Sequence, residues 1–335
     1  MKLEPIYKSP AISLYRLANK NNIACYLAST PETRKICNDP FIYGVNYTEK
    51  LKKAVTKTLR ALKNKHCCLL SSEENAVIFN ILRGGLNYGL REALYRAFGW
   101  SRQHSAFISS QRIKDKKHGW HITENRYQKI YMPDDAHIVL GDVVATGTSL
   151  EHALLKLVDI ARAKNKTIAS LTFFTIGSEY AEKIIAKVDK KCRRYFPNYL
   201  GSSVIYFEGR FGMVEEKKIF PRPLQIFFSG TDLLRSPAIL TPEFIHSQKE
   251  SISYALERCV IYDAGSRAFH IKGYLKDVHS YWQQVAQLAK AGQKLDAYLA
   301  ERFPEDIRLT NKKWRLKFSS PKQLLLIAKK QLRKK

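Results

Sequence analysis

The sequence lacks the features that mark several large classes of protein. No stretch approaches the roughly 18 consecutive apolar residues of a membrane-spanning helix. The N-terminal residues MKLEPIYKSPAISLYRLANK contain neither the uninterrupted apolar segment nor the small-residue cleavage site of a secretory signal. The patterns H-E-x-x-H, G-x-S-x-G, Walker A and G-x-G-x-x-G are also missing. We therefore expect a cytoplasmic protein, and the zincin, α/β-hydrolase, P-loop and dinucleotide-binding classes have no support in the sequence.

Cysteine and acidic residues are both scarce. The 335 residues include six cysteines, none of them in a C-x-x-C pair, and Cys67 and Cys68 lie in an apolar run. We interpret the cysteines as reduced core residues rather than as disulfides or metal ligands. Asp and Glu total 30 against 57 Lys and Arg, which gives a formal net charge of +27. This excess of positive charge predicts an anionic partner: nucleic acid, an acidic membrane or a polyphosphate ligand.

The order of apolar patterns predicts the fold class. Apolar residues recur at helical spacing in residues 49–63, 86–98, 150–161 and 179–188. Short apolar runs typical of strands occupy residues 76–82, 106–113, 121–132, 138–140, 168–176 and 203–207. Later in the chain, residues 221–242 are predicted to be irregular, and residues 242–257 and 276–303 to be helical. Alternating strands and helices favour an α/β fold, a mostly parallel sheet with helices on both faces.

The most informative segment is HIVLGDVVATGTSL, residues 137–150. A strand over 138–140 is expected to end there, and a loop over 141–149 leads into a helix. Backbone N–H groups at such a helix start suit a phosphomonoester, as do threonine and serine hydroxyls, and a glycine permits close approach. Asp142 is in a position to accept hydrogen bonds from sugar hydroxyls. The phosphate-binding candidates are Val143, Val144, Ala145, Thr146, Gly147, Thr148 and Ser149.

This segment resembles the phosphoribosyl-pyrophosphate (PRPP) motif of type I phosphoribosyltransferases. That motif has a hydrophobic strand, two acidic residues, two aliphatic residues and a Thr-Gly-rich loop. The resemblance implies that Asp142 acts in catalysis by orienting the ribose and that the loop holds the 5′-phosphate. One position departs from the motif, because Gly141 stands where the first acid is expected. This departure leaves weaker ribose binding, a different substrate and a degenerate site as open alternatives.

Two further segments resemble parts of the same family. Arg83, Gly84 and Gly85 follow a predicted strand and resemble the pyrophosphate-binding loop, in which glycines let the backbone approach phosphate oxygens and arginine supplies a cation. Residues 112–129 hold six basic and two acidic residues and resemble the mobile hood loop that closes over PRPP. The resemblance makes Arg112 and Lys114 catalytic candidates that neutralise the leaving pyrophosphate. A solvated basic hairpin is the alternative.

A third segment bears on the acceptor. Residues 259–269, CVIYDAGSRAF, resemble the uracil-recognition segment of uracil phosphoribosyltransferases. The resemblance makes Asp263, Ala264 and Gly265 base-binding candidates. Ser266 stands where that subfamily has a second Asp, and its phosphate loop usually has Asp-Pro where this chain has Gly-Asp. An ordinary turn stays an open alternative.

The resemblance sets the expected domains. We expect a phosphoribosyltransferase-like domain over residues 1–275. Its core is expected at about 45–207, and a small hood region with the base-recognition elements at about 208–275. A basic helical C-terminal extension is expected over residues 276–335.

The extension offers a second binding surface. Its last 31 residues carry 11 Lys and Arg against two acids. Ser320 and Pro321 have the N-cap and N1 pattern of a final helix. Three placements are open for this helix: it packs within the chain, it lies on an acidic membrane, or it packs on a partner subunit. The cations interleaved with Trp314, Leu316 and Phe318 make the tail a candidate nucleic-acid surface.

The resemblance implies Mg²⁺-dependent transfer of a phosphoribosyl group from PRPP to a nitrogenous base, a pyrimidine such as uracil, with release of pyrophosphate. Mg²⁺ would be held through PRPP and water rather than by direct protein ligands, and the family favours homodimers. Two other functions stay open. One is a non-catalytic protein that senses PRPP or nucleotides, and the other is an RNA-associated protein that uses the basic tail.

Overall fold

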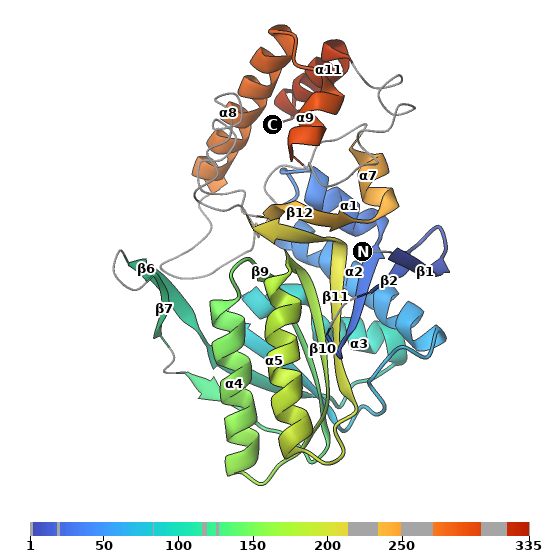
Figure 1. The fold of residues 1–335 in the computed structure, drawn as a ribbon, viewed down its shortest axis with the longest axis vertical. Helices are drawn as coiled ribbons and strands as arrows, with labels where there is room; N and C mark the ends of the chain where they lie inside the picture. The colour runs from blue at the N-terminus through green and yellow to red at the C-terminus, as the bar shows by residue number, and fades with distance from the viewer. Residues whose placement is uncertain are drawn as a thin grey trace.

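A computed structural model describes residues 3–18, 21–82, 84–115, 119–124, 127–213, 234–248, 271–302 and 320–334. Its centre is a ten-stranded sheet (Figure 1). The strands of this sheet are β1 (Leu3–Lys8), β2 (Ser13–Leu17), β3 (Ala24–Ser29), β4 (Ala76–Leu82), β5 (His104–Ser109), β8 (Gln128–Lys129), β9 (Ala136–Val144), β10 (Ile168–Ser178), β11 (Gly201–Met213) and β12 (Leu234–Leu240). Two more strands, β6 (Gln111–Asp115) and β7 (Gly119–Glu124), form a separate antiparallel hairpin.

The middle of the sheet is parallel. Neighbouring strands run in the order β3-β11-β10-β9-β4-β5, each parallel to the next. Antiparallel strands complete the edges, with β1 and β2 beyond β3, β8 beyond β5, and β12 against β11. Because the carboxyl ends of parallel strands meet at one edge, the loops after β4, β9 and β10 lie near one another.

Helices cover the two faces in separate groups. The described helices are α1 (Pro31–Asn38), α2 (Gly44–Asn64), a short 3₁₀ helix η1 (Gly84–Tyr88), α3 (Leu90–Phe98), α4 (Thr148–Ala163), α5 (Tyr180–Tyr195), α7 (Pro242–Ser247), α8 (Ile271–Lys290), α9 (Leu295–Arg302) and α11 (Pro321–Leu332). Helices α4 and α5 pack on one face of the sheet, and α1, α2 and α3 pack on the other (Figure 1). The α/β class predicted from the sequence is therefore confirmed. None of the described helices is both long and apolar enough to cross a bilayer.

The C-terminal helices α8, α9 and α11 lie together at one end of the molecule (Figure 1). Their apolar residues continue the cluster formed by α2 and α7. Two contacts join them to the chain before α2: the Tyr274 hydroxyl donates to the Pro40 carbonyl (2.6 Å), and Lys334 pairs with Asp39 (2.6 Å). Of the three placements open for the final helix, packing within the chain is the one observed.

Local signals account for several element boundaries. Strand β4 has the predicted bounds because AVIFNIL is apolar except for Asn80 and is buried along almost its whole length. Helix α11 starts where predicted, since Ser320 accepts a hydrogen bond from the backbone N–H of Lys322 (3.2 Å) and proline follows at the first helical position. These signals need no tertiary context.

Other predicted boundaries are wrong because strand pairing extends beyond the local signal. Strand β9 continues to Val144, so Gly141 and Asp142 lie in the strand rather than in the predicted loop. Pairing with β10 carries it there, with Asp142 opposite Thr175. Strand β11 continues to Met213 in the same way, flanked by β10 and β12.

Three more differences concern element type. The helix predicted over 86–98 begins as the 3₁₀ helix η1, and the α-helix starts only at Leu90. The single strand predicted over 106–113 is two, β5 and β6, and the strand predicted over 121–132 divides into β7 and β8. Strand β12 lies in the segment predicted to be irregular.

The cysteines match their predicted role where the structure describes them. Cys25, Cys37 and Cys192 are buried, Cys67 and Cys68 are half-buried, and all five are free thiols. Burial raises the pKa of the Cys192 thiol to about 12. These side chains act as core residues.

Candidate functional site

A short loop, residues 145–147, joins β9 to α4 and carries the predicted phosphate site. The helix starts at Thr148 behind Gly147, whose φ of +79° is the left-handed conformation that glycine adopts without strain. A Cβ atom at this position would overlap Cδ1 of Ile184 from α5. The Ser178 hydroxyl at the end of β10 donates to the Ala145 carbonyl (2.5 Å). The loop is therefore fixed by both neighbouring elements.

The loop borders a pocket of about 190 Å³. The residues that line it are Asp142, Val143, Val144, Ala145, Gly147, Ser149 and Leu150. The pocket therefore lies at the N-terminus of α4, where the first N–H groups of a helix have no partner within the helix and the helix dipole favours an anion. The hydroxyl oxygens of Thr146 and Thr148 lie 3.4 Å apart beside it. Eight of the predicted site residues are thus grouped at one place, six of them as pocket lining and Thr146 and Thr148 next to it.

Gly84 lies against Asp142, although 58 residues separate them. A Cβ atom at Gly84 would overlap the carboxylate oxygen Oδ1 of Asp142. The Gly84 carbonyl accepts a hydrogen bond from the Asn87 side chain (2.9 Å). Gly85 approaches the backbone of β4 and β9 closely, since its Cβ would lie 3.2 Å from Asn80 Cα and 3.4 Å from the Gly141 carbonyl oxygen. The two glycines of the predicted pyrophosphate loop therefore serve close packing against the strand that carries Asp142.

Tyr88 occupies the space beside Gly141. A Cβ atom at Gly141 would lie less than 3.0 Å from three atoms of Tyr88, including two of its ring. The Tyr88 hydroxyl donates to the Asp142 carbonyl (2.9 Å) and accepts from the Ile176 N–H (3.3 Å), so it bridges β9 and β10. The side chain is 1% exposed. No acidic side chain fits at position 141 while this ring is present, which gives the departure from the family motif a physical cause.

Asp142 itself is half-buried at the end of β9. Its Oδ1 accepts a hydrogen bond from the N–H of Val143 (2.8 Å), and its carbonyl is held by Tyr88. This carboxylate is the acidic group in the lining of the pocket. The arrangement presents one anionic acceptor next to a phosphate-sized site rich in N–H donors.

Several predicted site residues lie outside the described part of the chain. They are Arg83, Asp263, Ala264 and Gly265. Arg112 and Lys114 lie on β6, and only their backbone is described. The backbone of the β6–β7 hairpin contacts α4, which places the predicted hood loop beside the helix that starts at the pocket (Figure 1).

Sequence reasoning missed three residues that shape the site: Tyr88, Ser178 and Ile184. Each comes from an element other than β9 and α4. The signal for Tyr88 was the glycine at 141, because a missing side chain in a buried strand requires a large neighbour. Ser178 follows a predicted strand at its carboxyl end, where parallel sheets carry their sites.

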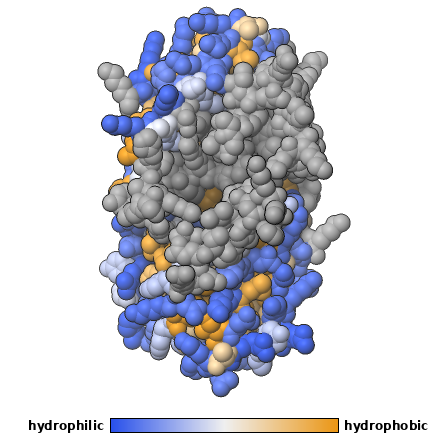
Figure 2. Space-filling model, turned by 90° about the vertical axis from the view of Figure 1, so that its left-hand side faces the viewer, coloured by the Kyte–Doolittle hydropathy of each residue, from blue (hydrophilic) through white to orange (hydrophobic). Residues whose placement is uncertain are grey.

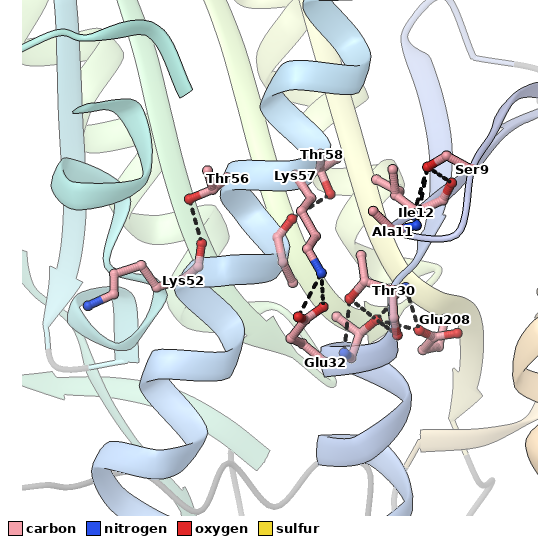
Figure 3. A network of polar contacts seen from close by, with 12 residues as sticks. Ser9, Ala11, Ile12, Thr30, Glu32, Lys52, Thr56, Lys57, Thr58 and Glu208 are labelled. Atoms are coloured by element: carbon pink, nitrogen blue, oxygen red, sulfur yellow. Dashed lines mark hydrogen bonds and ion pairs between the residues drawn. The ribbon is translucent and has the colours of Figure 1, made fainter. Parts of the chain in front are cut away.

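A second polar cluster surrounds Glu208 on β11. Glu208 is fully buried with φ +65° and accepts hydrogen bonds from Ser29 (2.7 Å), the Thr30 N–H (3.2 Å), Thr33 and Thr241 (3.1 Å). Figure 3 shows it facing Thr30 at the start of α1, beside the Glu32–Lys57 ion pair. Glu208 therefore joins β3 to the starts of α1 and α7, and it is not part of the pocket lining.

The Glu208 cluster gives a pH prediction. Burial raises the pKa of its carboxyl from 4.5 to about 7, against the opposing effect of its hydrogen bonds and of Arg34. Folding then favours the protonated form, so the stability from this group is full below pH 4.5 and is lost as pH rises through about 7. We expect the wild type to lose up to about 3 kcal/mol of unfolding free energy between these limits relative to Glu208→Gln.

Urea denaturation from pH 4.5 to pH 8 measures this difference. Glu92→Gln, at an exposed position on α3, is the control and should follow the wild type. Parallel pH dependence in the wild type and Glu208→Gln would contradict the prediction.

Comparisons with known proteins find similarity among solved structures. No protein-family model matches the sequence, and no curated protein matches it. A hypoxanthine phosphoribosyltransferase from Staphylococcus aureus is 14% identical over 47% of this chain and 74% of its own, with a TM-score of 0.27. A purine phosphoribosyltransferase from Pyrococcus horikoshii is 18% identical over 51% of this chain and 94% of its own, with a TM-score of 0.24. A xanthine-guanine-hypoxanthine phosphoribosyltransferase from Helicobacter pylori is 14% identical over 49% of this chain and 88% of its own, with a TM-score of 0.26.

Proposed function

We propose that this protein transfers a phosphoribosyl group from PRPP to a nitrogenous base and releases pyrophosphate. The observation that carries the proposal is the grouping of Asp142 and the 145–149 loop around one pocket at the carboxyl edge of a parallel sheet, with Gly84 packed against Asp142. The resemblance of the sequence motif suggests the chemical identity of the ligand, and the start of α4 at the pocket favours an anionic group such as its 5′-phosphate.

The proposed step is a displacement at C1′ of PRPP. A ring nitrogen of the base forms the new bond to C1′ while the bond from C1′ to the pyrophosphate oxygen breaks, and its electron pair leaves with pyrophosphate. The proton on the attacking nitrogen passes to solvent. The N–H groups and hydroxyls of residues 145–149 hold the 5′-phosphate, and Asp142 orients the ribose. Positioning and charge neutralisation therefore supply most of the rate enhancement.

Mg²⁺ fits this site only together with substrate. The described lining of the pocket offers one carboxylate, Asp142, which is too few protein ligands for a dedicated magnesium cage but enough to orient a hydrated ion. A Mg²⁺ ion that entered with PRPP would reduce the charge on the leaving pyrophosphate. Arg83, Arg112 and Lys114 are proposed to share that role.

The acceptor is proposed to be a purine or pyrimidine base. Residues 263–265 resemble a uracil-recognition segment, which favours a pyrimidine. The similar solved structures named above are purine-type enzymes, and the resemblance to uracil enzymes has no counterpart among them.

A second function is favoured by one observation. Gly141 stands where the motif has its first acid, and the Tyr88 ring fills the space that an acidic side chain would need. With a single carboxylate for the ribose, the site suits a protein that binds PRPP or a nucleotide and does not turn it over.

Pyrophosphate release from PRPP with Mg²⁺ and a panel of bases separates the two functions. We expect turnover with at least one base and a loss of about 100-fold or more in kcat/KM in Asp142→Asn, because the ribose loses its anionic acceptor. Asp159→Asn, an exposed acid on α4, is the control. Tight PRPP binding with no turnover on any base would contradict the enzyme and favour the sensor.

A further inference from the structure

Helix α11 uses its two faces differently. Leu324, Ile327 and Ala328 are 0%, 5% and 0% exposed, and they pack in the apolar cluster that α8 and α9 share. An amphipathic helix binds a membrane by inserting its apolar face between lipids. Because this face is already buried within the chain, only the opposite face is available to a partner.

The opposite face is basic, with one exposed apolar side chain among the cations, Leu326, which is 58% exposed. Lys322, Lys329 and Arg333 are spaced seven and four residues apart, which places them on one side of the helix, and Lys330 adjoins them. All four are exposed. Residues 320–335 contain no Asp or Glu, and among the described residues none of the four forms an ion pair. We call these four residues the α11 basic face.

The α11 basic face is held rigidly. Lys334, just beyond it, pairs with Asp39 and lies 5.6 Å over the Phe41 ring, so the helix end is anchored to the segment between α1 and α2. Three of the four cations lie in or just after the last turn, where the helix dipole favours positive charge. The dipole does not account for Lys322, which lies in the first turn.

Helix α8 packs beside α11 and adds exposed lysines to the same end of the molecule, including Lys272, Lys276 and Lys290. Asp277 of α8 and the two acids of α9, Asp296 and Glu301, offset most of this charge, so that α8 and α9 together carry +1. Figure 2 shows a mostly hydrophilic surface at this end on the side that it draws. The positive charge of the three helices is therefore concentrated on α11.

We propose that the α11 basic face binds the phosphate backbone of single-stranded nucleic acid. The row from Lys322 to Arg333 is about 16 Å long at 1.5 Å per residue, which is long enough to face several successive phosphates. Binding of this kind is driven by release of counterions, so it weakens steeply as salt rises. This interaction is separate from the pocket at Asp142 and does not depend on its function.

The test uses the full-length protein and a fluorescein-labelled single-stranded RNA of about 20 nucleotides, followed by fluorescence anisotropy over a salt series. The test variant carries Lys322→Gln, Lys329→Gln, Lys330→Gln and Arg333→Gln. A control variant of equal net charge carries Lys53→Gln, Arg91→Gln, Lys156→Gln and Lys190→Gln, all at exposed positions on other helices. Near-ultraviolet circular dichroism checks that both variants fold.

We expect the test variant to bind at least tenfold more weakly at 0.1 M salt and its salt slope to fall by about three, at about 0.7 per lost phosphate contact. The control should bind within about twofold of wild type. An equal loss in both variants, or no RNA binding by wild type, would overturn the proposal. Wild-type binding to phosphatidylserine vesicles in place of RNA would overturn it in favour of a membrane.

Discussion

Replacing Gly141 by aspartate, the residue that the family motif has there, is expected to destabilise the protein instead of completing its site. The new Cβ would lie less than 3.0 Å from atoms of Tyr88, which is 1% exposed and whose hydroxyl is hydrogen-bonded to both β9 and β10. Overpacking a core costs about 1–3 kcal/mol, and a buried carboxylate without partners adds to that. We expect the free energy of unfolding to fall by about 3 kcal/mol or more, measured by urea denaturation.

A double-mutant cycle isolates the cause. Tyr88→Ala removes the ring and is itself destabilising, but in that background Gly141→Asp should cost about 2 kcal/mol less than it does alone. Equal costs in both backgrounds, or a Gly141→Asp variant as stable as wild type, would show that Tyr88 does not determine this position.

Replacing Gly147 by valine is expected to abolish the phosphate site. A β-branched residue at φ +79° is strained, and its side chain would overlap Ile184. The loop must then move away from α5, and the N–H groups of residues 145–149 lose their common direction. We expect the affinity for PRPP, measured by titration calorimetry with Mg²⁺, to fall about 100-fold or more, since several charge-assisted hydrogen bonds are lost together.

Gly99 offers a matched control for this substitution. It follows α3 with φ +80°, and a Cβ atom at this position would meet no other atom within 4 Å, so Gly99→Val carries the same backbone strain without the collision or the site. We expect Gly99→Val to lower stability and leave PRPP affinity unchanged. Similar losses of affinity in both variants would mean that general destabilisation is the cause.

The sequence predicted those parts of the fold that local patterns specify. The alternation of strands and helices, the bounds of β4 and the start of α11 follow from apolar spacing and capping residues. Strands β1 to β3 carried no prediction, because β3 is fixed by its pairing with β11, which lies far along the chain. Glycine and aspartate are poor strand formers, so β9 was expected to end before Gly141, and its pairing with β10 extends it to Val144.

The candidate site also has one part that the local sequence predicts and another part that depends on contacts between distant segments. The motif around Asp142 located the loop and its helix, since those residues are consecutive. The contact of Gly84 with Asp142 and the ring of Tyr88 beside Gly141 depend on how three strands meet, which no local pattern encodes. The Glu208 cluster depends on tertiary structure in the same way, because its four donors, Ser29, Thr30, Thr33 and Thr241, lie far from it along the chain.

The most direct test of the central claim, that residues 145–149 hold the 5′-phosphate of PRPP, is a crystal structure of the protein with PRPP and Mg²⁺. We expect the 5′-phosphate at the N-terminus of α4, within hydrogen-bond distance of the N–H groups of residues 146–149, with the ribose hydroxyls facing Asp142. A phosphate bound elsewhere, with the pocket at Asp142 empty of ligand, would contradict it.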